Sequence, residues 1–178
     1  MTGIPLHPLR HKALQEGRLS VLRVPFREQP TVHKWQGRKF IAERAPYAPG
    51  DYFVREAWDE KMFSGFTEAQ GEYDAWGVIY KADYPQDRKV KWQSARSMPE
   101  EYARYILTLG PPVPGRLGDV DVSTMQQEGT FASLMQDPCD MAKQIKDKYR
   151  DEWNTIYPRH PWSPDLWTWA YSATWRRR

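Results

Sequence analysis

Basic side chains are concentrated near the start of this sequence, where their type and spacing suit contact with phosphate groups. Arginine offers a planar fork of N–H donors that matches phosphate oxygens, and each neutralised phosphate adds a salt-dependent increment of affinity. If the segment is extended, Arg23 and Arg27 share one face. We predict contact with a nucleic-acid backbone, and solvated strand charges are the alternative. The residues concerned are Arg18, Arg23, Arg27, Lys34, Arg38 and Lys39.

An aromatic residue stands inside this basic segment. Trp35 lies in the stretch HKWQGRK, residues 33–39. Stacking of a base on an exposed aromatic ring is worth about 1–3 kcal/mol, and neighbouring cations attract the phosphates. Trp35 is therefore a candidate stacking residue, and the alternative is a hairpin residue that covers the end of a barrel.

One acidic and one basic residue alternate further along the chain. Arg55 and Glu56 are adjacent in the segment 51–58, DYFVREAW, which has the composition of a strand. Their side chains face opposite sides, so one of them should be buried or line a cleft, where a charge needs a partner. We favour a structural ion pair and keep Arg55 as a candidate ligand contact.

The sequence has few residues that could bind a metal or act as a reactive thiol. His7 and His11 have the i, i+4 spacing that could hold a metal, but no third ligand is nearby, so we expect a surface pair and no metal. Cys139 falls in the first turn of an expected helix, where the dipole lowers a thiol pKa, yet no histidine accompanies it. No phosphate-cradling glycine loop, nucleophile elbow or dinucleotide fingerprint occurs, so we expect no cofactor.

The composition limits the class of protein. The chain has 178 residues, 40% of them apolar, and nine tryptophans help to raise the aromatic share to 14%. This length fits one domain. No apolar run reaches the roughly 20 residues of a membrane span, and the N-terminus has no stretch suited to a signal peptide, so we expect a cytoplasmic protein without a membrane partner. A single cysteine excludes an internal disulfide.

The net charge of +3 is unevenly distributed. Residues 1–44 carry nine basic and three acidic groups, whereas residues 99–157 carry six and ten. The chain ends on Arg176, Arg177 and Arg178. If the two basic ends meet in the fold, they form one positive face that attracts phosphate; a frayed arginine tail is the alternative.

The elements that must position these residues are short. Helices are predicted at about 5–15, stopped by Gly17, and from the N-cap Asp137 and Pro138 to Ile156. Apolar residues of the second helix recur at a spacing of three or four and should face the core: Met141, Ile145, Tyr149, Trp153 and Ile156. A helical turn is expected at 100–103. The predicted strands are 51–58, 76–82, 105–109 and 166–174. Most tryptophans fall in these segments and should be core. The pattern suggests an α+β domain built on a small mixed or antiparallel barrel.

Several fragments follow one another in the order found in the ASCH family of PUA-like domains. The chain resembles this family, and within it the members encoded by phages. The first is ALQEGRLSVLRVP, and APGDYFVREAW and YKAD follow. Trp92, Met98-Pro99, the segment 103–109 and Glu128-Gly129 come next. The last are the Trp153-x-x-Ile156-Tyr157 helix and the closing strand 167–171. These fragments lie at residues 13–25, 48–58, 80–83, 92–99, 103–109, 128–129, 153–157 and 167–171.

The resemblance implies one PUA-like β-barrel domain over residues 1–178, with irregular insertions around 59–98 and 110–137 and a cleft that meets RNA or a nucleotide. One branch of the family is an amidohydrolase that uses a lysine, a threonine and a glutamate. Leu19 and Leu22 stand at the lysine and threonine positions here, and leucine is neither a base nor a nucleophile. Ser20 and Glu128 remain weak catalytic candidates.

We therefore expect a phage-type protein that binds RNA or a nucleotide and lacks amidohydrolase activity. One alternative is an enzyme, a nuclease or amidohydrolase, that acts on nucleic acid or modified nucleosides in the same cleft. Another is a module for phage–host protein interaction, with a host protein as partner and exposed tryptophans as anchors.

Overall fold

The fold is known from a computed structural model that describes residues 2–29, 45–67, 71–83, 90–130 and 138–178. Of these, residues 62–67, 71–76, 138 and 139 are described by their backbone alone. The predicted residues Lys34, Trp35, Arg38 and Lys39 and the predicted N-cap Asp137 lie outside the described residues.

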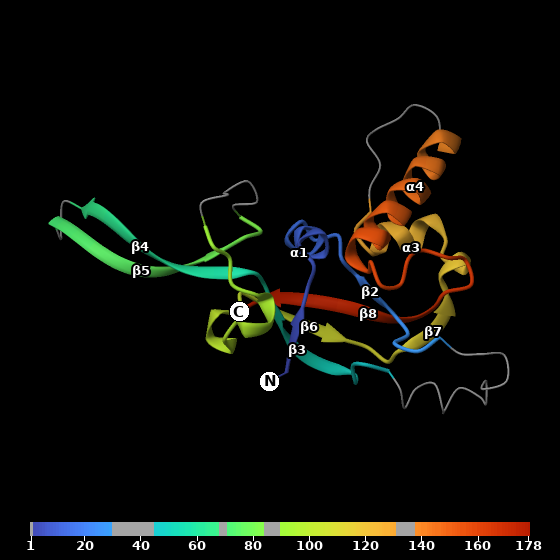
Figure 1. The fold of residues 1–178 in the computed structure, drawn as a ribbon, viewed down its shortest axis with the longest axis horizontal. Helices are drawn as coiled ribbons and strands as arrows, with labels where there is room; N and C mark the ends of the chain where they lie inside the picture. The colour runs from blue at the N-terminus through green and yellow to red at the C-terminus, as the bar shows by residue number, and fades with distance from the viewer. Residues whose placement is uncertain (1, 30–44, 68–70, 84–89, 131–137) are drawn as a thin grey trace.

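The centre of the molecule is a curled, mixed sheet that forms a half-barrel, so the expected α+β class is confirmed (Figure 1). Its hydrogen-bonded order is β1-β3-β6-β8-β2, with β7 paired to β8. Only the pair β1 and β3 is parallel. The strands are β1 (Gly3–Pro5), β2 (Val21–Pro25), β3 (Gly50–Arg55), β6 (Tyr105–Leu109), β7 (Val113–Arg116) and β8 (Trp167–Arg177).

The last strand, β8, holds the sheet together. Its C-terminal half pairs with β6, and its N-terminal half pairs with β7 and β2. One long strand shared by three partners lets the sheet bend along its length, which produces the half-barrel. The predicted strand 166–174 thus continues to Arg177.

In the described part of the chain, three helices of more than one turn cover one side of this sheet: α1 (Pro8–Gln15), α3 (Val122–Gln127) and α4 (Pro138–Ile156). The predicted spacing on α4 is confirmed, because Ile145, Tyr149 and Trp153 are fully buried. Single 3-10 turns are η2 (Ala95–Ser97), η3 (Glu100–Tyr102) and η4 (Leu117–Asp119), and η3 matches the predicted helical turn.

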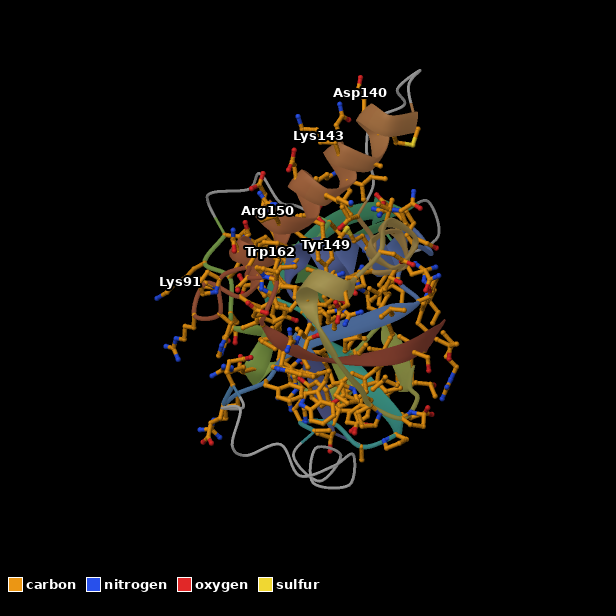
Figure 2. All side chains as sticks on the ribbon, turned by 90° about the vertical axis from the view of Figure 1, so that its right-hand side faces the viewer. Lys91, Asp140, Lys143, Tyr149, Arg150 and Trp162 are labelled. Atoms are coloured by element: carbon orange, nitrogen blue, oxygen red, sulfur yellow. The ribbon has the colours of Figure 1, made fainter. Side chains whose placement is uncertain are left out.

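The start of α4 extends beyond the body of the protein. Figure 2 shows Asp140 and Lys143 on this projecting part, whereas Tyr149 points toward the body. Arg150 lies over the ring of Trp162, with its Cζ 4.6 Å from the ring centroid. The residues of α4 that contact the site described below come from the second half of the helix.

A hairpin projects from the opposite side of the molecule as a long arm (Figure 1). It consists of β4 (Trp58–Thr67) and β5 (Gly71–Tyr80), which form a separate two-stranded sheet. The predicted strand 76–82 is the end of β5. Apart from Trp58, the arm lies within the region 59–98, where the family resemblance implies an irregular insertion; this part of the region is instead a regular hairpin.

Two local predictions are corrected by the structure. The first helix begins at Pro8 rather than Pro5, because residues 3–5 pair with β3 as a strand. The predicted strand 51–58 ends at Arg55, since the backbone N–H of Glu56 is donated to Sδ of Met98 and not to a neighbouring strand. Trp58 then opens β4 in the other sheet.

Most of the tryptophans with described side chains are packed inside, as expected. Trp58, Trp153 and Trp169 are buried, and Trp167 is partly buried against the main core. No helix in the described part of the chain is long and apolar enough to cross a membrane.

Candidate functional site: a buried cluster of charges and its pocket

A fully buried carboxylate, that of Glu128, is the centre of the site. Its Oε2 accepts hydrogen bonds from Nη2 of Arg10 at 3.0 Å and from the hydroxyl of Tyr149 at 2.9 Å. Its Oε1 accepts one from Nε of Arg23 at 2.6 Å. Both oxygens are thus engaged. The four side chains come from α1, β2, α4 and the end of α3, so this cluster joins four elements.

The turn after α3 places Glu128 in the interior. Asp121 caps the start of α3 by accepting from the N–H of Thr124 at 2.7 Å. At the other end Gly129 adopts a φ of +96°, which only glycine adopts without strain. The carbonyl of Gln127 accepts from the N–H of Ser20 at 2.8 Å, so this turn is tied to the start of β2.

The cluster carries more positive than negative charge. Arg10 and Arg23 are 5% and 6% exposed and share the single carboxylate of Glu128. Burial disfavours the charge of Arg10, but Glu128, together with Tyr149 and Tyr157, outweighs this effect and raises the pKa of Arg10. Burial, together with Glu128, also raises the pKa of Tyr149 well above its usual range, so its hydroxyl is neutral. Two cations and one anion therefore leave one positive charge uncompensated within the cluster.

A second buried carboxylate lies on the other side of α1. Glu56 is paired with Arg104, whose Nη2 is 2.6 Å from Oε2 and whose Nε is 3.1 Å from Oε1. Arg104 also contacts Asp83, with Nη1 2.7 Å from Oδ2. The predicted ion pair at position 55 or 56 is therefore found, and Glu56 is its buried member.

His11 is the correction among the histidines. It is 1% exposed rather than on the surface, and its Nε2 lies 2.9 Å from Oε2 of Glu56. The atoms are close but lack hydrogen-bond geometry, so the contact is electrostatic when the imidazole is protonated. His7 accepts from the N–H of Leu9 and caps α1. Among the residues that the structure describes, no three His, Cys, Asp or Glu side chains are grouped to hold a metal.

A pocket of about 290 Å³ opens beside Glu128, between α1 and α4. Four cationic side chains line it. Its three acids already have partners: Glu128 in the cluster, Glu16 at Arg18, and Glu152, whose Oε2 accepts from Thr130 Oγ1 at 2.6 Å. The buried Nε of Arg10 has no hydrogen-bond partner among the described residues. The cations are Arg10, Lys12, Arg18 and Lys148.

The predicted basic residues are only partly brought together. Arg18 lines the pocket and donates to Glu16 and to the carbonyl of Gly129. Arg23 is buried, with Nη1 donating to Thr168 Oγ1 at 3.0 Å. Arg27 is exposed beyond the end of β2, and Arg55 donates to the carbonyl of Arg96 at 3.0 Å on another side of α1.

The weak catalytic candidates differ in their surroundings. Ser20 is exposed, and Glu128 has both oxygens engaged by cations and a tyrosine. Leu19 and Leu22 are each 2% exposed and belong to the main core. Neither candidate is therefore placed as a free general base beside a nucleophile among the residues that the structure describes.

Sequence reasoning overlooked Arg10 and Tyr149. Arg10 stands between the buried apolar residue Leu6, just before α1, and the buried Ala13 and Leu14 within α1, and a charge at a core position signals a buried partner. Tyr149 was assigned to the core by its spacing, which is correct, but its hydroxyl also needed a partner.

No protein-family model, curated protein or solved structure matches this chain.

Proposed function

We propose that this protein binds RNA or a nucleotide, and that the pocket beside Glu128 holds a phosphate group. The observation that carries the proposal is the pair of buried guanidinium groups, Arg10 and Arg23, which share one carboxylate at the wall of a pocket. An anion in the pocket would compensate the remaining positive charge, and phosphate suits arginine and lysine donors.

The size and the exposure of the pocket agree with this ligand. About 290 Å³ lies at the lower end of the range for small-molecule sites, which suits one nucleotide rather than a large cofactor. Lys12 and Lys148 are exposed at its rim, so a longer nucleic acid can reach it. The resemblance to the ASCH family implies a nucleic-acid cleft on a PUA-like barrel of phage type, and we include that assignment in the proposal.

We propose binding without amidohydrolase chemistry. Leu19 and Leu22 are core residues that offer no reactive atom, and both oxygens of Glu128 are engaged by Arg10, Arg23 and Tyr149. Neither oxygen of that carboxylate is therefore free to contact a substrate as a general base.

The test is binding of labelled single-stranded RNA, followed by fluorescence anisotropy, with nucleoside monophosphates as competitors. Arg18→Gln and Lys148→Gln should each weaken binding about tenfold, because each removes a charge-assisted contact to phosphate. Lys143→Gln is the matched control, since it removes the same charge from the projecting part of α4 (Figure 2). Binding that ignores both pocket variants, or that shows no salt dependence, contradicts the proposal. Turnover of RNA or modified nucleosides by the pure protein would favour the enzyme alternative instead.

A further inference from the structure

A second, more open groove of about 560 Å³ lies at the C-terminal end of β8. Its walls come from the end of β5, from η3 and from the last residues of the chain. The cationic residues in it are Arg104, Arg177 and Arg178, and the aromatic ones are Tyr80 and Tyr102. Glu101 is the one acid among the residues that line it.

The terminal arginines are held in place and do not form a frayed tail. Arg176 and Arg177 are paired with Ile106 and Tyr105 in the sheet, and the backbone N–H of Arg178 donates to the carbonyl of Arg104 at 2.9 Å. Neighbouring residues of a strand face opposite sides. Arg176 contacts Asp51, with Nη2 3.1 Å from Oδ2, whereas Arg177 is exposed and lines the groove.

The floor of the groove is rigid. The Cζ of Arg104 lies 3.8 Å from the centroid of the Tyr80 ring, and the hydroxyl of Tyr80 donates to the carbonyl of Tyr102 at 2.6 Å. The hydroxyl of Tyr102 donates to Oε1 of Glu60 at 2.7 Å. Aromatic rings and guanidinium groups fixed in one surface form the combination that binds the backbone and bases of single strands.

The groove and the pocket flank the same end of α1. Gln15, the last residue of α1, donates from Nε2 to Oδ1 of Asp83 at 3.2 Å, and Asp83 is paired with Arg104 of the groove. The next residues, Glu16 and Arg18, line the pocket. Two cationic depressions therefore lie on either side of one helix end.

From this arrangement we infer that the groove binds the sugar–phosphate backbone of a single-stranded nucleic acid, one nucleotide of which occupies the pocket. The inference rests on the proposed function and specifies its ligand as a strand rather than a free nucleotide. Arg177 is the groove residue that we expect to contact the phosphates, since it is exposed and its guanidinium has no hydrogen bond or ion pair with any residue that the structure describes.

The experiment compares Arg177→Gln with Arg176→Gln, two equal losses of charge on opposite faces of β8. Both variants and the unaltered protein are titrated by anisotropy with a labelled RNA dinucleotide and with a single-stranded RNA of about ten nucleotides. Arg177→Gln should weaken binding of the longer strand about three- to tenfold and lower the slope of log affinity against log salt by about 0.7. Binding of the dinucleotide should stay unchanged, and Arg176→Gln should leave both within about twofold.

The outcomes separate the two proposals. If the longer strand binds no more tightly than the dinucleotide, or if the two variants weaken it equally, the groove inference is wrong and the pocket proposal stands. If neither RNA binds the unaltered protein, the proposed function fails and the groove inference falls with it.

Discussion

Each of the two buried carboxylates among the described residues accepts hydrogen bonds from an arginine, but the two clusters differ in charge. Glu128 has two guanidinium partners, whereas Arg104 has two carboxylate partners, Glu56 and Asp83. The Glu128 cluster thus carries a net positive charge, and it borders a pocket lined by further cations. This difference is why we expect the Glu128 cluster itself to attract an anion, whereas phosphate binding in the groove beside Arg104 depends on Arg177 and Arg178.

Removal of the central carboxylate should be costly. Glu128→Gln leaves Arg10 and Arg23 buried without a counter-charge, so the free energy of unfolding should fall by about 3–5 kcal/mol. Urea unfolding, monitored by circular dichroism, measures this change in the free energy of unfolding. Asp165→Asn is the control, because its pair with Arg116 is exposed and should contribute no more than about 1 kcal/mol. Equal losses for the two variants would show that the buried cluster is not structural.

The stability should also decline at alkaline pH. Burial, together with Glu128, raises the pKa of Tyr149 above the usual value of 10.0, so the unfolded chain loses this proton before the folded one does. The contribution of the neutral Tyr149 hydroxyl to the free energy of unfolding is fully present below pH 10, and it is lost as the pH rises further. Tyr149→Phe should weaken that pH dependence in urea titrations at increasing pH. A residual slope is expected, since burial raises the pKa of Tyr171 to about 12. An unchanged slope would contradict the assignment.

Among the elements, α1 places the largest number of the side chains that contact the two buried carboxylates and Asp83. Its neighbouring residues Arg10 and His11 reach the two buried carboxylates, and its last residue contacts Asp83. The helix also passes close to the turn after α3, where a Cβ on Gly129 would overlap the Cβ of Ala13. Small shifts between α1 and α3 therefore alter the Glu128 cluster.

This close approach gives a prediction at the scale of elements. Gly129→Ala should lower the free energy of unfolding by at least about 2 kcal/mol, because it combines a φ of +96° with the overlap at Ala13. Gly115→Ala is the matched control, as nothing lies within 4 Å of a Cβ built there. Thermal or urea unfolding compares the two. If Gly129→Ala left the free energy of unfolding unchanged, α1 and α3 would adjust freely to each other.

At the scale of the whole molecule, the half-barrel with its helices is one unit, and the β4–β5 arm is an addition to it (Figure 1). A hairpin that stands alone has little stability of its own. The base of the arm is packed on the half-barrel unit, since Trp58 is buried and the hydroxyl of Tyr80 donates to the carbonyl of Tyr102. The arm should therefore be removable while its base is kept.

Replacement of residues 62–76 by Asn-Gly tests this division. Lys61 and Gly77 are opposite each other in the hairpin, so a two-residue turn can join them. The unfolding temperature should change by less than about 4 °C, the shift that corresponds to roughly 1 kcal/mol in a chain of this size. Loss of cooperative unfolding would show that the arm belongs to the folding unit.

Sequence patterns predicted the elements better than they predicted the site. The helix that ends at Ile156 and the strand 105–109 follow from apolar spacing and β-branched residues, which act locally. The break after Arg55 was not foreseen, because it depends on Met98, a residue distant in sequence. In the site, Arg18 and Glu128 were among the candidates, but neither their partners nor the pocket follow from spacing.

The sequence alone thus indicates an α+β chain with a basic start, a basic end and aromatic strands, since composition and periodicity are local properties. Burial and pairing are not local. The same basic segment supplies Arg23 to the interior, Arg18 to the pocket and Arg27 to the solvent, and the fold separates them by the turn at Gly17 and the end of β2. Which arginine holds Glu128 and which is exposed to a ligand depends on packing between elements more than 100 residues apart along the chain.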